Sequence, residues 1–328
     1  MTEFFRNTLI LVHEECRRQF ALSGLSDEIK QAINRRNVMF NEHPMTLVAL
    51  PIAAFDAAGG SQPETAVTAA AAIEFLLAAA DVLDDLQDGE PHDANCSAAL
   101  CQDRYINEAE VLTALLLLVE QSSLSLFDTS QPCDRVVQAI SRFNQFKFRS
   151  FRGQYSDAHS VIDSDASPEV SLQIVVEKSG SLGRCAGEFG AALATDNEAT
   201  VKKLGQFGEH LAVASQFNDD VANLWPRTGK LEDLEQLKKT LPLTFSVSAA
   251  RHPAGAEGQT LVSMVQPNGS ATNGVNRVLD ARDEVFALGG IHFAMLQATI
   301  HLAKARTIAC EFKDSAPDSK LLELLRTV

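Results

Sequence analysis

The stretch AAAAIEFLLAAADVLDDLQD, residues 69–88, decides the fold of this chain. It contains no Gly or Pro and is apolar on nearly every face until acids appear at its C-terminal end. Such a segment predicts a central buried helix, because a surface helix keeps a polar face along its whole length. The apolar run from Thr65 to Ala80 carries only Glu74, and at this length a buried helix is favoured over a membrane-spanning one.

The rest of the chain shares this helical character. Segments rich in Ala, Leu, Glu and Phe alternate with short breaks rich in Gly, Pro, Asp and Ser, and period-two runs of β-branched residues are nearly absent. No break has the composition of an interdomain linker, so the sequence predicts one all-α domain, residues 1–328, built as a helical bundle around a central apolar cavity. The predicted helices are 4–21, 26–38, 44–58, 64–88, 104–126, 132–159, 168–195, 198–224, 232–251, 256–266, 275–287, 291–312 and 318–327.

The overall charge limits the classes of partner. Lys and Arg number 28 and Asp and Glu number 43, which gives a net charge of −15. Phosphate backbones and anionic lipid surfaces would repel such a chain, so neither a nucleic-acid partner nor stable membrane insertion is expected. Charges interrupt the N-terminal apolar run, and the six cysteines form no Cys-x-x-Cys pair. These features favour a cytoplasmic protein with reduced thiols.

Two acidic clusters follow the spacing i, i+3, i+4, i+7. The first comprises Asp81, Asp84, Asp85 and Asp88, and the second comprises Gln216, Asp219, Asp220 and Asn223. On a helix this spacing places all four side chains on one face, where like charges repel unless a cation is bound. One cluster alone would be read as a solvated acidic face. Two clusters, each at the end of a long apolar helix, favour a shared divalent-metal site, and oxygen ligands one helical turn apart suit Mg²⁺.

An anionic ligand in such a site would also need cationic side chains. The candidates are Lys178 in VEKSGSLG, the pair Lys238 and Lys239 in KKTLP, and Lys230 in the preceding loop. Any single lysine is more often a solvated surface group, so these assignments depend on the motifs around them. Gly180, which follows Lys178, predicts a bend that would turn backbone carbonyl groups toward the cavity.

At this point the residues resemble a known family, the trans-isoprenyl diphosphate synthases or polyprenyl synthetases. DDLQD and QFNDD are similar to its first and second aspartate-rich motifs, GQYSD to its Gly-Gln-x-x-Asp, and EKSG to its Lys-Thr/Ser-Gly. DLEQLKKTLPL resembles its Asp-Leu…Lys-x-Thr-Leu-Pro segment. Along the chain these matches begin at residues 84, 153, 177, 216 and 233, which is the order that the family shows. The resemblance therefore spans nearly the whole chain.

The resemblance implies a class I isoprenoid synthase fold that binds three Mg²⁺ ions and an allylic isoprenyl diphosphate, in a homodimer. By this analogy the metal ligands would be Asp84, Asp88 and Asp219, with Asp85, Asp220 and Asn223 supporting or ligating. Lys178 and Lys239 would hold the diphosphate, Gln154 would face the developing allylic cation, and Lys230, Lys238 and Gln216 would contribute to substrate binding. Metal and lysine would stabilise the departing diphosphate, while a dry apolar pocket would delay capture of the cation by water.

Two departures from the family pattern bear on the second substrate. Where chain-elongating members carry Gly-Lys-x-x-Arg-Pro to bind isopentenyl diphosphate, this chain has MFNEHP, with Phe40 and His43 at the positions of the two cations. The family's Arg-Arg pair after the first acidic motif is also missing, and no cation occurs there before Arg104. A second diphosphate would be poorly compensated, so the isopentenyl diphosphate site is predicted to be lost or degenerate. Asn223 supplies no charge, which predicts weaker metal binding at the second motif.

The residues before the first acidic motif bear on substrate length. Family members use bulky side chains there to limit the product, whereas this chain has Ala79 and Ala80. Small side chains predict a deep pocket for a C15 or C20 allylic substrate, with Phe75 or Leu76 as a floor further down. An alternative is that the alanines merely permit close helix packing.

The leading hypothesis from the sequence is a terpene synthase that ionises an allylic diphosphate without isopentenyl diphosphate. One alternative is a chain-elongating synthase that binds isopentenyl diphosphate through Arg35, Arg36 or Arg104. Another is a prenyltransferase to a different acceptor, such as a peptide. A third is an inactive regulatory subunit, which the intact acidic motifs disfavour.

Overall fold

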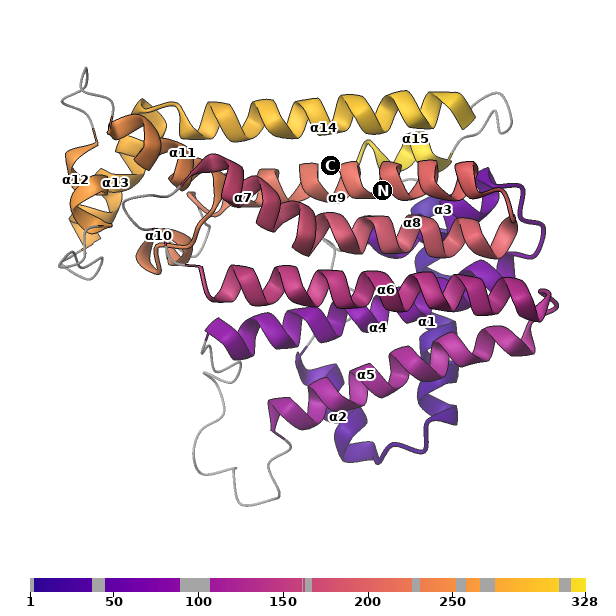
Figure 1. The fold of residues 1–328 in the computed structure, drawn as a ribbon. Helices are drawn as coiled ribbons and strands as arrows, with labels where there is room; N and C mark the ends of the chain where they lie inside the picture. Colours follow the sequence, from indigo (N-terminus) through magenta and orange to yellow (C-terminus); the bar gives the residue numbers. More distant parts are fainter. Residues whose placement is uncertain are drawn as a thin grey trace. The chain divides into compact units, whose positions relative to one another are not determined.

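The computed structural model describes residues 3–36, 45–88, 107–160, 162, 167–225, 231–251, 258–265, 275–312 and 320–328. These residues form helices joined by short connections and no β-strand, so the predicted all-α class is confirmed (Figure 1). The elements are α1 (Glu3–Leu22), α2 (Asp27–Arg36), α3 (Met45–Ala57), α4 (Pro63–Asp88), α5 (Glu108–Leu124), η1 (Ser125–Asp128), α6 (Cys133–Ala158), α7 (Pro168–Val175), η2 (Val176–Gly180), α8 (Ser181–Ala194), α9 (Glu198–Ala222), α10 (Glu232–Glu235), α11 (Leu241–Ala250), α12 (Gln259–Met264), α13 (Val275–Ala287), α14 (Gly290–Phe312) and α15 (Lys320–Leu324).

The chain divides into two compact units, each assembled from separated stretches of sequence. Unit 1 comprises Met1–Phe146, Gly183–Gly208 and Ile308–Thr327. Unit 2 comprises Lys147–Leu182, Glu209–Thr307 and Val328. The division falls inside α6, α8, α9 and α14 rather than in a linker. The single domain expected from the sequence stays a prediction.

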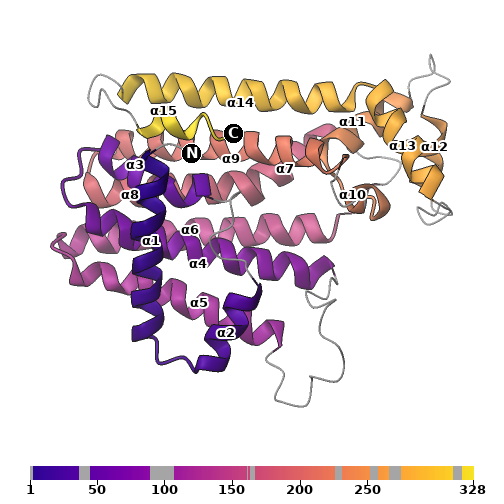
Figure 2. The same ribbon diagram turned by 180° about the vertical axis from the view of Figure 1, so that it is seen from behind.

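The centre of unit 1 is α4, as its composition predicts. The helices α1, α3 and α5 pack against it, and Figure 2 shows α1 crossing α4 and α5. All residues from Ala69 to Ala79 are buried, and Glu74 is buried with them. Alanines at this spacing let neighbouring helices approach closely, so α4 gains its stability from packing on every side.

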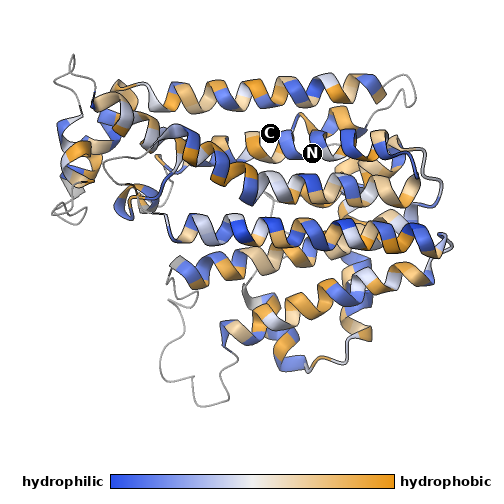
Figure 3. Cartoon of the chain, in the orientation of Figure 1, coloured by the Kyte–Doolittle hydropathy of each residue, from blue (hydrophilic) through white to orange (hydrophobic). Residues whose placement is uncertain are grey.

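Two helices are long and apolar enough to cross a membrane by length and composition alone, within Pro63–Gln87 and Glu108–Asp128. The apolar window of the first is 78% buried inside the protein, whereas that of the second is 44% buried. Burial of α4 in the core agrees with the prediction. The second helix, α5, leaves Leu116, Leu117 and Leu124 exposed, and Figure 3 shows hydrophobic colouring along it.

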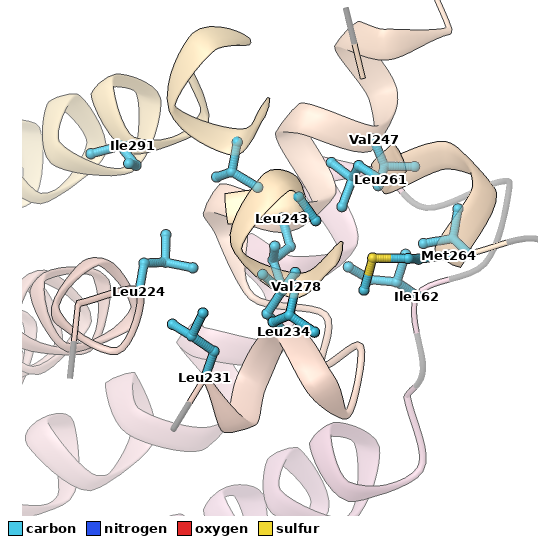
Figure 4. Close-up of a cluster of buried hydrophobic side chains, with 13 residues drawn as sticks. Ile162, Leu224, Leu231, Leu234, Leu243, Val247, Leu261, Met264, Val278 and Ile291 are labelled. Carbon is cyan, nitrogen blue, oxygen red and sulfur yellow. The ribbon is translucent and has the colours of Figure 1, made fainter. Parts of the chain in front are cut away.

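Unit 2 has its own apolar core, which holds the segment after the second acidic motif (Figure 4). Leu231 and Leu234 of the α10 region pack with Leu243 of α11, Leu261 of α12 and Val278 of α13. Burying five such side chains contributes on the order of 1.5–3 kcal/mol each. This core therefore fixes the short segment 236–240, which carries two of the candidate lysines.

Two predicted helices differ from the observed ones. The predicted helix 168–195 is observed as α7, the π-helical turn η2 and α8, so the bend expected near Gly180 is a local widening of a continuing helix. The predicted helix 232–251 is interrupted between α10 and α11. Leu237 there has a positive φ of 52°, and Pro242 lies in the first turn of α11. Because proline lacks an N–H group, it begins a helix more readily than it continues one.

The histidine pair between α9 and α14 predicts acid sensitivity. The Nδ1 atoms of His210 and His301 lie 3.2 Å apart. Burial, followed by the charges of His210 and Lys304, lowers the pKa of His301 to about 4. Since an unfolded histidine takes up a proton near pH 6.5, the unfolded state binds more protons below that pH.

We expect the folding stability to fall as the pH drops from 6.5 toward 4, and less steeply in His301→Gln. Denaturant unfolding at pH 7.5, 5.5 and 4.5 measures this difference. The exposed His159→Gln serves as the control, and parallel curves for wild type and His301→Gln would contradict the prediction.

Candidate active site

The first acidic cluster lies at the C-terminal end of α4, in unit 1. Helix α4 extends to Asp88, so the four acids keep the spacing that places them on one face. Asp81 is exposed, and Asp84 and Asp85 are half-buried. The side chain of Asp88 lies outside the described part of the structure. Carboxylates at the negative end of a helix dipole are unfavourable for folding, which points to a role in binding cations.

The second acidic cluster lies at the C-terminal end of α9, in unit 2. Gln216, Asp219 and Asp220 belong to the last turns of the helix, and Asn223 follows directly after it. The backbone N–H of Asn223 donates to the carbonyl of Asp219 at 2.9 Å, so the helical path continues. The Asn223 side-chain amide donates to Asp233 Oδ2 at 3.1 Å. A cation at Asn223 would therefore bind its amide oxygen.

Asp220 is the most perturbed carboxyl group in this part of the molecule. Gln216 Nε2 donates to its Oδ1 atom at 2.9 Å, whereas Oδ2 is buried and has no hydrogen-bond partner among the described residues. The pKa of Asp220 is raised to about 7, chiefly by burial and to a lesser extent by the carboxylates of Asp233 and Asp157. The hydrogen bond from Gln216 and the nearby Leu241 backbone act in the opposite direction. A bound cation would stabilise the ionised form and displace the proton.

The π-helical turn η2 places Lys178 and Ser179 in contact with Asp157 and Gln216, the neighbours of Asp220. Lys178 Nζ forms an ion pair with Asp157 Oδ2 of α6 at 2.6 Å, and Ser179 Oγ donates to Gln216 Oε1 of α9 at 2.8 Å. An inserted residue in a helix re-aims the side chains beside it, and such turns are frequent at functional sites. The widening thus lets adjacent residues reach two different helices.

A glycine brings α6 against η2. A Cβ atom at Gly153 would lie 2.3 Å from the backbone nitrogen of Lys178, which no real contact tolerates. Ser150 Oγ also donates to the Lys178 carbonyl at 3.2 Å. The neighbouring Gln154 is buried. Only glycine permits this close approach, so the glycine of the GQYSD motif fixes the position of Lys178 relative to α6.

The remaining candidate lysines belong to the segment after the second motif. Lys238 lies in the break between α10 and α11, with its Nζ atom 3.9 Å from Asp233 Oδ1. Lys239 is half-buried in the same break. Lys230 lies outside the described residues. Lys178 thus lies beside Asp157, and Lys238 lies beside Asp233. Both carboxylates also raise the pKa of Asp220.

Of the three apolar candidates on α4, Phe75 and Ala79 lie one turn apart on one face, and Ala80 lies on another. Phe75 is fully buried, and its ring lies 5.5 Å from that of Phe20 in α1. It precedes Asp84 by nine residues, or about 2.5 turns, which places it on the opposite face of the helix. Ala79 is buried, and Ala80, four residues before Asp84, shares the face of that acid. Leu77, which was not among the predicted site residues, lies about two turns before Asp84 on the same face.

The structure adds three polar residues to the second cluster. Asp157, Asp233 and Ser179 contact or influence the residues selected from the sequence. Each of them stands inside a quoted motif, GQYSD, DLEQLKKTLPL or EKSG. Their position in those motifs was the available signal, but their roles depend on which helices pack together.

The donor set fits Mg²⁺ in chemistry. In the described ranges, no three His, Cys, Asp or Glu side chains converge into a ready-made metal-binding group. Mg²⁺ does not require one, because it keeps several waters and uses one or two carboxylates together with substrate phosphate oxygens. The buried Oδ2 of Asp220, for which no described residue is a hydrogen-bond partner, is an available oxygen ligand of this kind.

The departures that predicted a lost isopentenyl diphosphate site fall on residues that the structure does not describe. Phe40 and His43 lie in 37–44, and Arg104 lies in 89–106. Arg35 and Arg36 end α2, and their side chains are not described. The loss of that site therefore stays a prediction.

Comparison with known proteins identifies the family. The family profile described as "Polyprenyl synthetase" matches residues 45–281. The (2E,6E)-farnesyl diphosphate synthase of Mycobacterium tuberculosis is 28% identical over 312 residues, 92% of this chain and 81% of the relative. Tryptophan prenyltransferase ComQ of Bacillus subtilis is 26% identical over 184 residues, 56% of this chain and 55% of the relative.

Solved structures agree in fold. A polyprenyl synthase from Caulobacter crescentus, solved with calcium and isoprenyl diphosphate, has a TM-score of 0.75 at 19% identity, covering 98% of this chain and 95% of that one. The resemblance read from the motifs is thereby confirmed. Because the family profile spans well over half of the sequence, the chain belongs to the polyprenyl synthetase family.

Proposed function

We propose that the protein is a prenyl diphosphate synthase that extends an allylic diphosphate with isopentenyl diphosphate. The observation that carries the proposal is the arrangement at the second acidic motif, where Lys178, Asp157, Gln216 and Asp220 interact as neighbours. The farnesyl diphosphate synthase relative, which this chain matches over 92% of its length, supports elongation. These findings favour the elongation alternative over the terpene synthase hypothesis drawn from the sequence.

Each acidic face has a defined part in this proposal. Asp84, Asp85 and Asp88 on α4, and Asp219, Asp220 and Asn223 at the end of α9, would hold the Mg²⁺ ions, which neutralise charge on the diphosphate. That the two faces share their ions, and that three ions bind, stay predictions. Lys178, Lys238 and Lys239, with Lys230, would bind phosphate oxygens. On substrate binding, Lys178 Nζ would give up part of its ion pair with Asp157 and would contact phosphate oxygens instead.

The reaction needs stabilisation of charge rather than a protein nucleophile. When the allylic C–O bond breaks, the electron pair leaves with the diphosphate, and the double bond of isopentenyl diphosphate attacks the allylic carbon. A proton then passes from the carbon next to the new cation to the released diphosphate, and a new double bond forms. Fixed cations near the leaving group lower the barrier because charge grows there in the transition state. Buried Gln154 would face the developing allylic cation, and apolar side chains around it would exclude water.

A second candidate is ionisation without isopentenyl diphosphate, with a terpene as the product. It is favoured by Phe40 and His43 at positions where the family carries cations. A variant of this candidate transfers the prenyl group to another acceptor, such as a peptide. The similarity to the tryptophan prenyltransferase of Bacillus subtilis supports that variant.

One assay separates these functions. Purified protein with Mg²⁺ is given geranyl, farnesyl or geranylgeranyl diphosphate, each with and without isopentenyl diphosphate. Longer diphosphates that form only with isopentenyl diphosphate are the expected result, with C15 or C20 allylic substrates preferred because Ala79 and Ala80 are small. Hydrocarbons formed without isopentenyl diphosphate would show that the second candidate, and not elongation, is the function. Diphosphate release without either product would indicate another acceptor, and no turnover would leave the regulatory role.

The assembly and location are further parts of the proposal. Exposed Leu116, Leu117 and Leu124 on α5 form an apolar strip of the kind found at interfaces between subunits. A homodimer in the cytoplasm is the state that we infer. Sedimentation of the purified protein, compared with a variant carrying Leu117→Glu, measures the association.

A further inference from the structure

The side chain of Ser179 begins a short chain of hydrogen bonds that ends at Asp220. Ser179 Oγ donates to Gln216 Oε1 at 2.8 Å, and Gln216 Nε2 donates to Asp220 Oδ1 at 2.9 Å. The first residue belongs to η2 and the other two belong to α9, so the chain links two segments of unit 2. We propose that Ser179 is a positioning residue that fixes, through Gln216, which oxygen of Asp220 is presented to a cation. This inference rests on the proposed function.

The amide of Gln216 needs a partner that fixes its orientation. A primary amide has a donor end and an acceptor end of nearly the same shape, and only the donor end is compatible with an ionised carboxylate. The Ser179 hydroxyl bonds the acceptor end, so the NH₂ group is directed at Asp220. Without that hydroxyl the amide keeps one partner and can rotate.

The consequence for Asp220 is that its two oxygens are no longer equivalent. Oδ1 is occupied by the amide of Gln216, and Oδ2 is buried with no hydrogen-bond partner among the described residues. A buried carboxylate oxygen without a partner is costly, and it is favourable only when something binds it. The chain from Ser179 therefore selects Oδ2 as the ligand atom.

The π-helical turn explains why a residue beside Lys178 can do this. Lys178 and Ser179 are consecutive, yet one contacts Asp157 on α6 and the other contacts Gln216 on α9. Gly180 follows, and a Cβ atom there would lie 3.0 Å from Val213 Cγ2, so the small residue lets η2 approach α9. The turn thus places Lys178 where it would bind the diphosphate, and it places Ser179 where its hydroxyl orients Gln216 toward Asp220.

A double-mutant cycle tests the chain of hydrogen bonds. Binding of Mg²⁺ together with inorganic diphosphate is measured by calorimetry in wild type, Ser179→Ala, Ser179→Thr, Gln216→Leu and the double variant Ser179→Ala with Gln216→Leu. We expect Ser179→Ala to weaken binding about 10-fold, roughly one hydrogen bond to a polar partner, and Ser179→Thr to restore it because the hydroxyl is retained. In the Gln216→Leu background, Ser179→Ala should have no further effect. Equal weakening in both backgrounds would overturn the inference.

A second measurement does not depend on binding or turnover. The side-chain NH₂ resonances of Gln216, identified by their loss in Gln216→Leu, should exchange slowly with solvent in wild type and Ser179→Thr and faster in Ser179→Ala. Ser171→Ala is the matched control, because its hydroxyl bonds Thr244 at 2.9 Å in the same unit without contacting Gln216. Unchanged exchange in Ser179→Ala would refute the positioning role. If the effects of Ser179→Ala and Gln216→Leu on binding are coupled but the protein shows no turnover, the proposed function would be refuted and the positioning role of Ser179 would stand.

Discussion

Asp219→Ala is expected to lower turnover by at least about 10²–10³-fold, the loss seen when a single group that stabilises transition-state charge is removed. The same loss is expected for Asp84→Ala in the first acidic cluster. Each acid lies in the last turns of a helix, α9 or α4, whose packing depends on apolar residues of other faces. The variants should therefore fold.

Steady-state kinetics with Mg²⁺ and an allylic diphosphate measure the loss, and circular dichroism checks that the helix content is kept. Gln206→Ala provides the matched control, because Gln206 is an exposed residue of the same helix as Asp219. We expect its turnover to equal that of the wild type. Wild-type activity in both Asp219→Ala and Asp84→Ala would refute the metal-binding role of the acidic faces.

In the metal-free protein, the free energy of unfolding of Asp220→Asn relative to that of the wild type is expected to be higher at pH 8 than at pH 4. Below the ordinary carboxyl pKa of 3.8 both the folded and the unfolded states are protonated, so Asp220 contributes no pH dependence. Between 3.8 and about 7 the unfolded chain loses the proton while the folded chain keeps it, and the free energy of unfolding of the wild type falls. A shift of this size corresponds to about 4 kcal/mol at most. Asparagine has no charge and escapes this loss.

Denaturant unfolding in the presence of EDTA, at pH 4, 6 and 8, measures the difference between Asp220→Asn and wild type at each pH. The new amide nitrogen is buried without a partner, which costs roughly 1–3 kcal/mol at every pH, so the change of the difference with pH is the diagnostic quantity. A difference that stays constant from pH 4 to pH 8 would show that Asp220 titrates normally. The variant should also lose Mg²⁺-dependent turnover, since stability and function oppose each other at a buried ligand.

Much of the candidate site follows from local sequence. Helical periodicity placed the acids of α4 and α9 on single faces, and the observed helices end where those acids occur. The motif GQYSD was quoted only for its resemblance to the family, and the close approach of backbone at Gly153 was not predicted. The break between α10 and α11 was missed, although Pro242 was a signal for a helix start. Phe75 lies on the face of α4 opposite Asp84, and its place in the floor of a pocket stays a prediction.

The helical class, the core position of α4 and the two acidic faces at helix ends could be predicted from the sequence, because helix periodicity and apolar composition act over a few neighbouring residues. The burial of Asp220, and the presence of Asp157, Asp233 and Ser179 around it or its partner Gln216, arise only when the helices pack. Those residues are up to 76 positions apart in the chain, between Asp157 and Asp233. Burial and charge interactions depend on distance in space, so the carboxyl pKa and the hydrogen bonds of this site arise when the helices of unit 2 pack together.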